Sequence, residues 1–130
     1  MSIERGRLIL TGSTRDPGKF YRASDAFLFT SYHEPFGLVI LEAIASGLPI
    51  LTYPVSGGGG AVDLLKEFEA TLLDDDASNE AIVSAIDHAC KKQTGAERLR
   101  KQAMDTYAWP SISARVVKIY DKLLAEWEGQ

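Results

Sequence analysis

Residues 31 to 49 read SYHEPFGLVILEAIASGLP and place one carboxylate, Glu42, inside an otherwise apolar helical run. A Pro-Phe-Gly turn can open this helix and Gly47 can end it. Burying an unpaired charge is costly, so we expect Glu42 to face a cleft where a polar ligand binds. The alternative is a solvated position on the outer face of an amphipathic helix.

Short apolar runs on both sides of this stretch alternate with helical patterns. Such alternation predicts an α/β fold: one Rossmann-like domain over residues 1–130, with a parallel sheet of about four strands, flanking helices and a C-terminal helical segment. The expected strands are 7–11, 26–30, 49–53 and 70–73. The expected helices are 17–23, 37–46, 62–66, 79–91 and 95–107, followed by a break at Trp109-Pro110 and a last helix to Trp127. Residues 74–78 can cap the helix at 79. The apolar residues of the last helix predict that it faces the core; they are Ile112, Val116, Ile119, Leu123, Leu124 and Trp127.

Composition narrows the function classes. The chain has 130 residues, 45% of them hydrophobic, and a net charge of -4 without a contiguous basic face, which argues against a nucleic-acid partner. Its single cysteine excludes an internal disulfide, and two histidines argue against a metal site of the cysteine-histidine type. Asp74 to Asp76 suit a helix-capping loop better than a metal site. No transmembrane run or signal-peptide order is visible, so we expect a cytoplasmic protein.

The expected site lies at one edge of the sheet. In parallel sheets, ligands bind beyond the carboxyl ends of the strands, so the loops at 31–37 and 54–60 should be neighbours. The N-terminus of the helix from Gly37 suits a phosphate, held by the amides of Phe36, Gly37 and Leu38. The four glycines 57–60 allow a second close approach to a ligand, although they could also form a flexible linker.

Two glutamates extend this site. Glu42 can accept two hydrogen bonds from a vicinal diol such as a ribose. Glu34 can contact groups beyond the phosphates, although an ordinary loop acid remains an alternative. The predicted ligand therefore combines a sugar, phosphates and a nucleoside.

The motif Glu34-Pro-Phe-Gly37-x4-Glu42-Ala-x2-Ser-Gly47-x-Pro49, preceded by Ser24-Asp25-Ala-Phe-Leu-Phe-Thr-Ser31, carries a family resemblance. It resembles the donor-binding C-terminal domain of GT-B glycosyltransferases, in particular glycosyltransferase family 4. The likeness covers about residues 7–73 well and the C-terminal helices loosely.

The resemblance implies a retaining transfer of a sugar from a nucleotide-diphosphate sugar, without a metal or a cofactor. By this likeness Glu42 would hold the ribose, and the amides of Gly37 and Leu38 would hold the diphosphate. Glu34 would contact the donor sugar and is the candidate catalytic residue. Stabilising the charge that develops on the leaving group would drive catalysis. Further residues expected to line the substrate site are Ser31, Phe36, Val39, Gly57 and Gly58.

The chain also departs from the family pattern. The acid that usually ends the Gly-Gly segment is absent, and Asp63 would be its displaced equivalent. The Arg and Lys that the family carries upstream are also absent from the sequence, as is the whole acceptor-binding domain. We therefore expect weak donor affinity unless Arg15, Lys19 or Arg22 replaces those cations, and little or no activity without an N-terminal acceptor domain or a partner chain.

Other readings of the chain remain. The alternatives are a non-catalytic nucleotide-sugar module, the donor subunit of a split enzyme, and an unrelated flavodoxin-like or receiver-like domain.

We expect residues 7–11 to pair directly with 26–30. We also expect residual exposed edge or apolar surface to favour a homo-oligomer.

Overall fold

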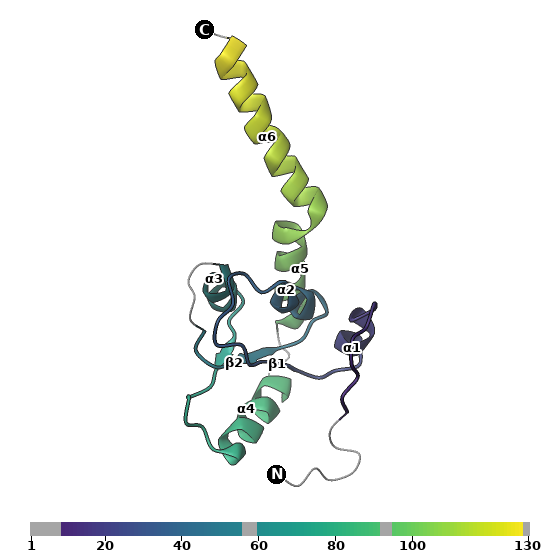
Figure 1. The fold of residues 1–130 in the computed structure, drawn as a ribbon, viewed down its shortest axis with the longest axis vertical. Coiled ribbons are helices and arrows are strands. Elements are labelled where there is room, and N and C mark those ends of the chain that lie inside the picture. Colours follow the sequence, from purple (N-terminus) through teal and green to yellow (C-terminus); the bar gives the residue numbers. More distant parts are fainter. Residues whose placement is uncertain (1–8, 56–59, 92–94, 129–130) are drawn as a thin grey trace.

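The computed structural model describes residues 9–55, 60–91 and 95–128. It contains a parallel sheet in the order β1 (Phe27–Phe29), β2 (Ile50–Thr52), β3 (Thr71–Leu72), surrounded by helices (Figure 1). The helices are α1 (Gly18–Arg22), α2 (Leu38–Ala45), α3 (Gly60–Glu67), α4 (Asn79–Lys91), α5 (Ala96–Tyr107) and α6 (Trp109–Glu128). The predicted α/β class is confirmed, with three strands rather than about four in the described part of the chain.

The missing strand is the one expected at residues 7–11. Residues 7 and 8 lie outside the described ranges, while residues 9–11 form no strand, and Ile9 and Leu10 are 78% and 87% exposed. Pairing them with β1 would place them beside a strand whose own Leu28 is exposed. Too little apolar area would be gained to offset the entropy of ordering the segment. The predicted direct pairing is therefore wrong for residues 9–11.

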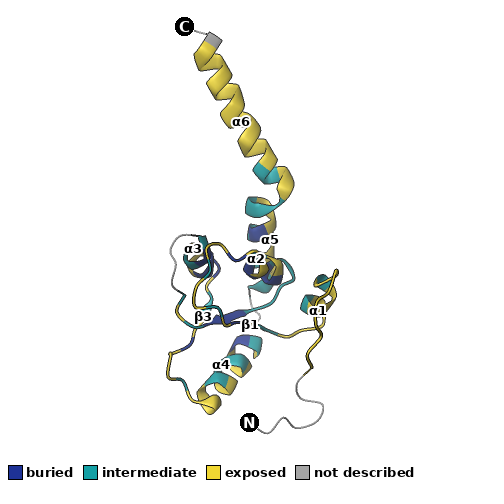
Figure 2. Ribbon diagram, in the orientation of Figure 1, coloured by how far each residue is buried: buried dark blue, intermediate teal, exposed yellow. Residues whose placement is uncertain are grey.

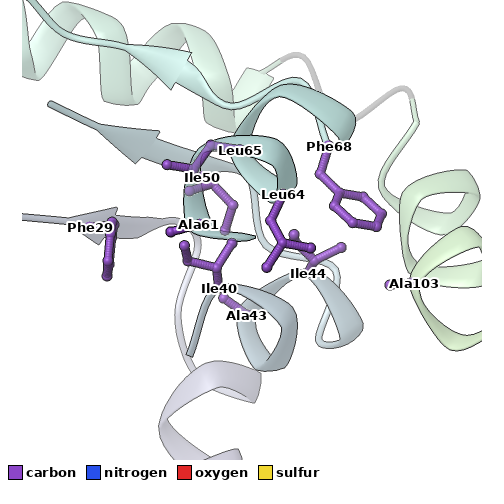
Figure 3. Close-up of a cluster of buried hydrophobic side chains, with 10 residues drawn as sticks. All are labelled: Phe29, Ile40, Ala43, Ile44, Ile50, Ala61, Leu64, Leu65, Phe68 and Ala103. Atoms are coloured by element: carbon purple, nitrogen blue, oxygen red, sulfur yellow. The ribbon is translucent and has the colours of Figure 1, made fainter. Parts of the chain in front are cut away.

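The sheet separates two apolar clusters. Ile50 packs in the larger cluster and its neighbour Leu51 in the smaller one, because successive side chains of a strand point to opposite faces. The larger cluster is formed by α2, α3 and α5 on one face of the sheet (Figure 3), and the smaller one by α4 on the other. Helix α2 lies at the centre of the larger cluster, with Ile40, Ala43 and Ile44 buried. The helix that carries the quoted motif is thus held on its inner face by the core.

Helix boundaries follow the predicted signals closely. The N–H of Gly47 donates to Ile44 O at 2.9 Å and that of Leu48 to Ala43 O at 3.1 Å, which ends α2 where expected. Ser78 Oγ accepts the N–H of Ala81 at 3.2 Å, so the segment before α4 does cap it. Two details differ from expectation: Gly60 is already helical, and the break before α6 falls at Ala108, which is extended with ψ 146°. Pro110 lies in the first turn of α6, where its missing N–H costs nothing.

Helix α6 departs most from expectation. It projects away from the body of the molecule, and almost all of it is coloured as exposed (Figure 2). Of the described side chains in it, only Ser111 and Ile112 are half-buried. The prediction that its apolar residues face the core is therefore wrong, because the described chain offers no surface for them to cover. Among the described residues, no helix combines the length and apolarity needed to cross a bilayer.

Candidate functional site

The loops that follow β1 and β2 lie side by side, as predicted for the carboxyl ends of neighbouring parallel strands. The N–H of Ala61 donates to Pro35 O at 3.4 Å. A Cβ atom on Gly60 would lie 2.4 Å from Phe36 Cδ2, so the Phe36 ring rests directly on the backbone of Gly60. The rings of Tyr32 and Tyr53, one from each loop, stack with centroids 6.3 Å apart. These contacts tie the motif loop to the start of α3.

Glu34 caps the N-terminus of α2. Its Oε1 accepts the N–H of Gly37 at 3.1 Å and that of Phe36 at 3.4 Å, and the residue is half-buried. Helix N-termini attract negative charge because their first amides lack partners within the helix. The end of α2 that was predicted to hold a phosphate therefore holds a carboxylate from the same loop, and the Gly37 amide is occupied.

The first two amides of α2, those of Leu38 and Val39, have no hydrogen-bond acceptor within the described part of the chain. Both side chains are exposed. The helix end is therefore open to an additional acceptor beside Glu34.

Gly37 sets the geometry of this helix end. Its φ of 78° lies in the left-handed region that side chains rarely adopt, and a Cβ atom there would lie 2.7 Å from Ile40 Cδ1. Ile40 is fully buried, so it cannot move aside freely. The glycine is thus required by the turn and by the core beneath it.

Glu42 lies on the exposed side of α2, one turn beyond the helix start, and Tyr21 from α1 orients it. The Tyr21 hydroxyl donates to Glu42 Oε2 at 2.9 Å. Partial burial, this hydrogen bond and the nearby negative charge raise the pKa of Tyr21 from 10.0 to about 12. Sequence reasoning missed Tyr21, because 21 residues separate it from Glu42 and no local pattern links the two.

The remaining predicted residues fall around this helix end or outside the described chain. Ser31 is half-buried at the start of the motif loop, and Asp63 is exposed in the first turn of α3. Gly57 and Gly58 lie outside the described residues. The candidate cations Arg15, Lys19 and Arg22 are exposed on or just before α1, with Lys19 Nζ 5.1 Å from the centroid of the Phe20 ring.

A separate cavity of about 330 Å³ lies at the opposite edge of the sheet, where β2 and β3 begin. Polar residues at its wall are Glu69, Thr71, His88 and Arg98, and the Arg98 Nη2 to Glu69 Oε1 distance is 2.7 Å. None of the predicted site residues that the structure describes lines it. The candidate site at the carboxyl edge is therefore distinct from this cavity.

Comparisons with known proteins agree with the motif. The family described as "Glycosyl transferases group 1" matches residues 5–106. A D-inositol 3-phosphate glycosyltransferase of Corynebacterium glutamicum is 32% identical over 108 residues, which cover 81% of this chain and 25% of that protein. A glycogen synthase of Mycobacterium tuberculosis is 32% identical over 98 residues, covering 75% of this chain and 24% of the relative.

Structural comparison gives the same fold. A chain in the crystal structure of the GtfA/B complex matches with a TM-score of 0.51 and 18% identity, over 83% of this chain and 24% of the other. The chain thus spans about a quarter of the length of the proteins compared here.

Proposed function

Since the chain belongs to the group 1 glycosyltransferases, we propose that it forms the donor-binding part of a retaining enzyme of this family. The donor is a nucleotide-diphosphate sugar, and the site is the N-terminal end of α2 with the loops beside it. The acceptor is bound by a separate domain or partner chain, and the compartment is the cytoplasm.

The observation that carries this proposal is the carboxylate of Glu34 at the amides of Phe36 and Gly37, directly before the first turn of α2. A diphosphate carries more charge and more acceptor oxygens than a carboxylate, so it competes well for the same donors. It would take over the Gly37 amide and also engage the free amides of Leu38 and Val39. Glu34 would then be released to contact the donor sugar, the role proposed for it as the catalytic residue.

Glu42 is the proposed ribose ligand. Its Oε2 accepts the Tyr21 hydroxyl, which leaves Oε1 and the remaining lone pairs for the two hydroxyls of a ribose. Tyr21 acts as a positioning residue, because it restricts the carboxylate before the ligand arrives and so lowers the entropy lost on binding.

The proposed chemistry rests on the leaving group. When the bond between the sugar and the diphosphate breaks, negative charge develops on the diphosphate oxygen, next to the N-terminus of α2. Ser31, Phe36, Gly57 and Gly58 would line the donor around it. Half a positive charge at one helix end is a weak anchor for a diphosphate, so we expect weak donor affinity for the chain alone.

Titration calorimetry with UDP-, GDP- and ADP-glucose tests the proposal. We expect a millimolar dissociation constant for at least one donor, and Glu42→Ala to weaken it about tenfold through the lost ribose contacts. Glu97→Ala, which removes an exposed acid from the first turn of α5, is the matched control and should leave binding unchanged. No binding at 10 mM of any donor, or equal losses in both variants, would contradict the proposal.

Inorganic pyrophosphate separates the two roles of Glu34. Glu34→Ala removes the competing carboxylate, so we expect pyrophosphate to bind at least as tightly as to the parent chain. The same variant should bind the full sugar nucleotide more weakly, because the sugar contact is lost. Equal weakening of both ligands would mean that Glu34 acts only by shaping the loop.

The second candidate is the donor subunit of a split enzyme, which transfers sugar only together with a partner chain; the structural neighbour from the GtfA/B complex supports it. Transfer of a radiolabelled sugar from the donor that binds distinguishes the two candidates. Transfer by the purified chain, without a partner chain, supports the first candidate. Transfer only after a cell lysate is added supports a subunit.

A further inference from the structure

The cavity at the amino edge of the sheet has a wall built partly from the core. It has a volume of about 330 Å³ and lies where β2 and β3 begin. Ile44, Ile50 and Phe68 form part of its wall, and all three are buried in the larger apolar cluster (Figure 3). Because core side chains pack in fixed positions, this part of the wall keeps its shape with or without a ligand.

Polar side chains stand at the open side of the cavity. Glu69, His88 and Arg98 line it and are exposed, and Arg98 Nη2 donates to Glu69 Oε1 at 2.7 Å. An ion pair between exposed side chains contributes little to stability, so a ligand can exchange for one of its members. An apolar wall with a few polar groups at the opening is typical of small-molecule sites.

Glu69 holds its place at a conformational cost. Its φ of 55° lies in the left-handed region, which favours glycine. It ends α3, where its N–H donates to Lys66 O at 3.2 Å and that of Ala70 donates to Leu65 O at 2.9 Å. A glycine would form this turn more easily but would leave Arg98 without its carboxylate. The side chain of Glu69 therefore keeps the Arg98 guanidinium at the cavity wall.

The charge balance of the wall favours an anionic ligand. Carbonyls near the ends of α2 and α3 accept backbone N–H groups of the turns that follow them. The first amides of α5, by contrast, have no acceptor within the described part of the chain. In that part of the chain, Arg98 donates to Glu69 and Gln102 and so uses two of its five N–H groups. The unused hydrogen-bonding capacity is thus on the donor side, which suits a carboxylate.

We propose that this cavity binds a small organic carboxylate with an apolar body. The carboxylate contacts Arg98 in place of Glu69, and the apolar body packs against Leu48, Phe68 and Leu99. The cavity has the volume of about eleven water molecules at about 30 Å³ each, so the ligand has about as many non-hydrogen atoms. None of the donor-site residues that the structure describes lines the cavity, so this inference does not depend on the donor proposal.

Titration of the nitrogen-15-labelled chain with 3-phenylpropanoate, a carboxylate of this size, tests the proposal by nuclear magnetic resonance. We expect a dissociation constant of about 1 mM. The backbone amide signals of Gly47, Thr71 and Leu99 should shift, because these residues line the cavity. 3-Phenylpropanamide has nearly the same shape without the charge, and it should bind about tenfold more weakly.

The two members of the ion pair should act in opposite directions. Arg98→Gln removes the guanidinium and should weaken carboxylate binding about tenfold, while binding of the amide stays unchanged. Glu69→Gln removes the competing carboxylate and should tighten carboxylate binding about fivefold. Arg100→Gln removes the same charge from an exposed position of α5 that does not line the cavity, and it should leave binding unchanged. All three side chains are exposed, so circular dichroism should show each variant folded.

Four results would overturn the proposal. The first is no shift of the cavity amides at 20 mM carboxylate. The second is a shift confined to the amides of Leu38 and Val39, which would place the carboxylate at the N-terminal end of α2. The third is equal binding of the amide and the carboxylate. The fourth is weaker binding in both Arg98→Gln and Glu69→Gln, since the ion pair would then act only by holding α3 against α5.

Discussion

Replacing Gly37 by alanine tests how the turn before α2 is built. The alanine would keep φ near 78°, which costs about 1 to 2 kcal/mol for a residue with a side chain. Its Cβ would also meet Ile40 Cδ1 at 2.7 Å in a buried cluster, and such overpacking costs about 1 to 3 kcal/mol. We therefore expect Gly37→Ala to lower the free energy of unfolding by about 2 to 5 kcal/mol.

Gly47→Ala is the matched control. Gly47 has a similar φ of 83°, but no atom lies within 4 Å of the position a Cβ would take. Its alanine variant should therefore lose only the conformational part, about 1 to 2 kcal/mol. Urea unfolding at one protein concentration, followed by circular dichroism at 222 nm, measures both.

The variant Ile40→Val isolates the steric part, because it removes the atom that the new Cβ would meet. Alone it should cost about 0.5 to 1.5 kcal/mol. Combined with Gly37→Ala, it should cost less than the sum of the two single variants. Equal losses for the two glycine variants, or strict additivity of the double variant, would refute the account of this turn.

Three further predictions concern other parts of the chain. The pKa of Tyr21 is about 12 in the folded chain and 10.0 ordinarily, so the protonated hydroxyl stabilises the fold fully below pH 10 and less as the pH rises toward 12. The urea midpoint of the Tyr21→Phe variant should therefore fall less steeply between pH 10 and 12 than that of the parent chain. Ser78→Ala removes the cap of α4 and should cost about 1 kcal/mol in urea unfolding, whereas Ser84→Ala in the middle of that helix should cost nothing. Ile44→Ala empties a buried position and should cost about 2 to 5 kcal/mol, whereas Val83→Ala at an exposed position should change stability by less than about 0.5 kcal/mol.

Much of the fold could be predicted because its signals are local. The span of α4 was predicted to the residue, and Gly47 marked the end of α2, because caps and stop signals depend on a few neighbouring residues. The adjacency of the two loops also followed from the alternation of strands and helices, since parallel strands carry their carboxyl ends to one edge.

The errors concern what lies next to an apolar segment. Residues 9–11 and the apolar face of α6 have the composition of a strand and a core helix, yet almost all of their side chains are exposed. A pattern of apolar residues indicates that a surface will be covered, but it does not say by which surface. Whether burial occurs within this chain depends on tertiary contacts that the periodicity does not encode.

The sequence named residues that lie around the N-terminal end of α2, but it did not give the contacts between them. The motif gave Glu34, Gly37 and Glu42, and the helix end was expected to attract an anion. That Glu34 itself would occupy the end of α2, and that Tyr21 would hold Glu42, depends on side-chain geometry across loops and helices.

One extended residue, Ala108, joins α5 to α6, so α6 can swing about it as a rigid rod. The direction of the last helix is set by the backbone angle of Ala108 and by a hydrogen bond of 2.6 Å that Arg115 Nη2 donates to Thr106 O. A swing of about 10° at this pivot would displace the far tip of a rod some 30 Å long by about 5 Å. A partner surface held at the far tip of α6 would therefore move by that distance relative to the α/β body.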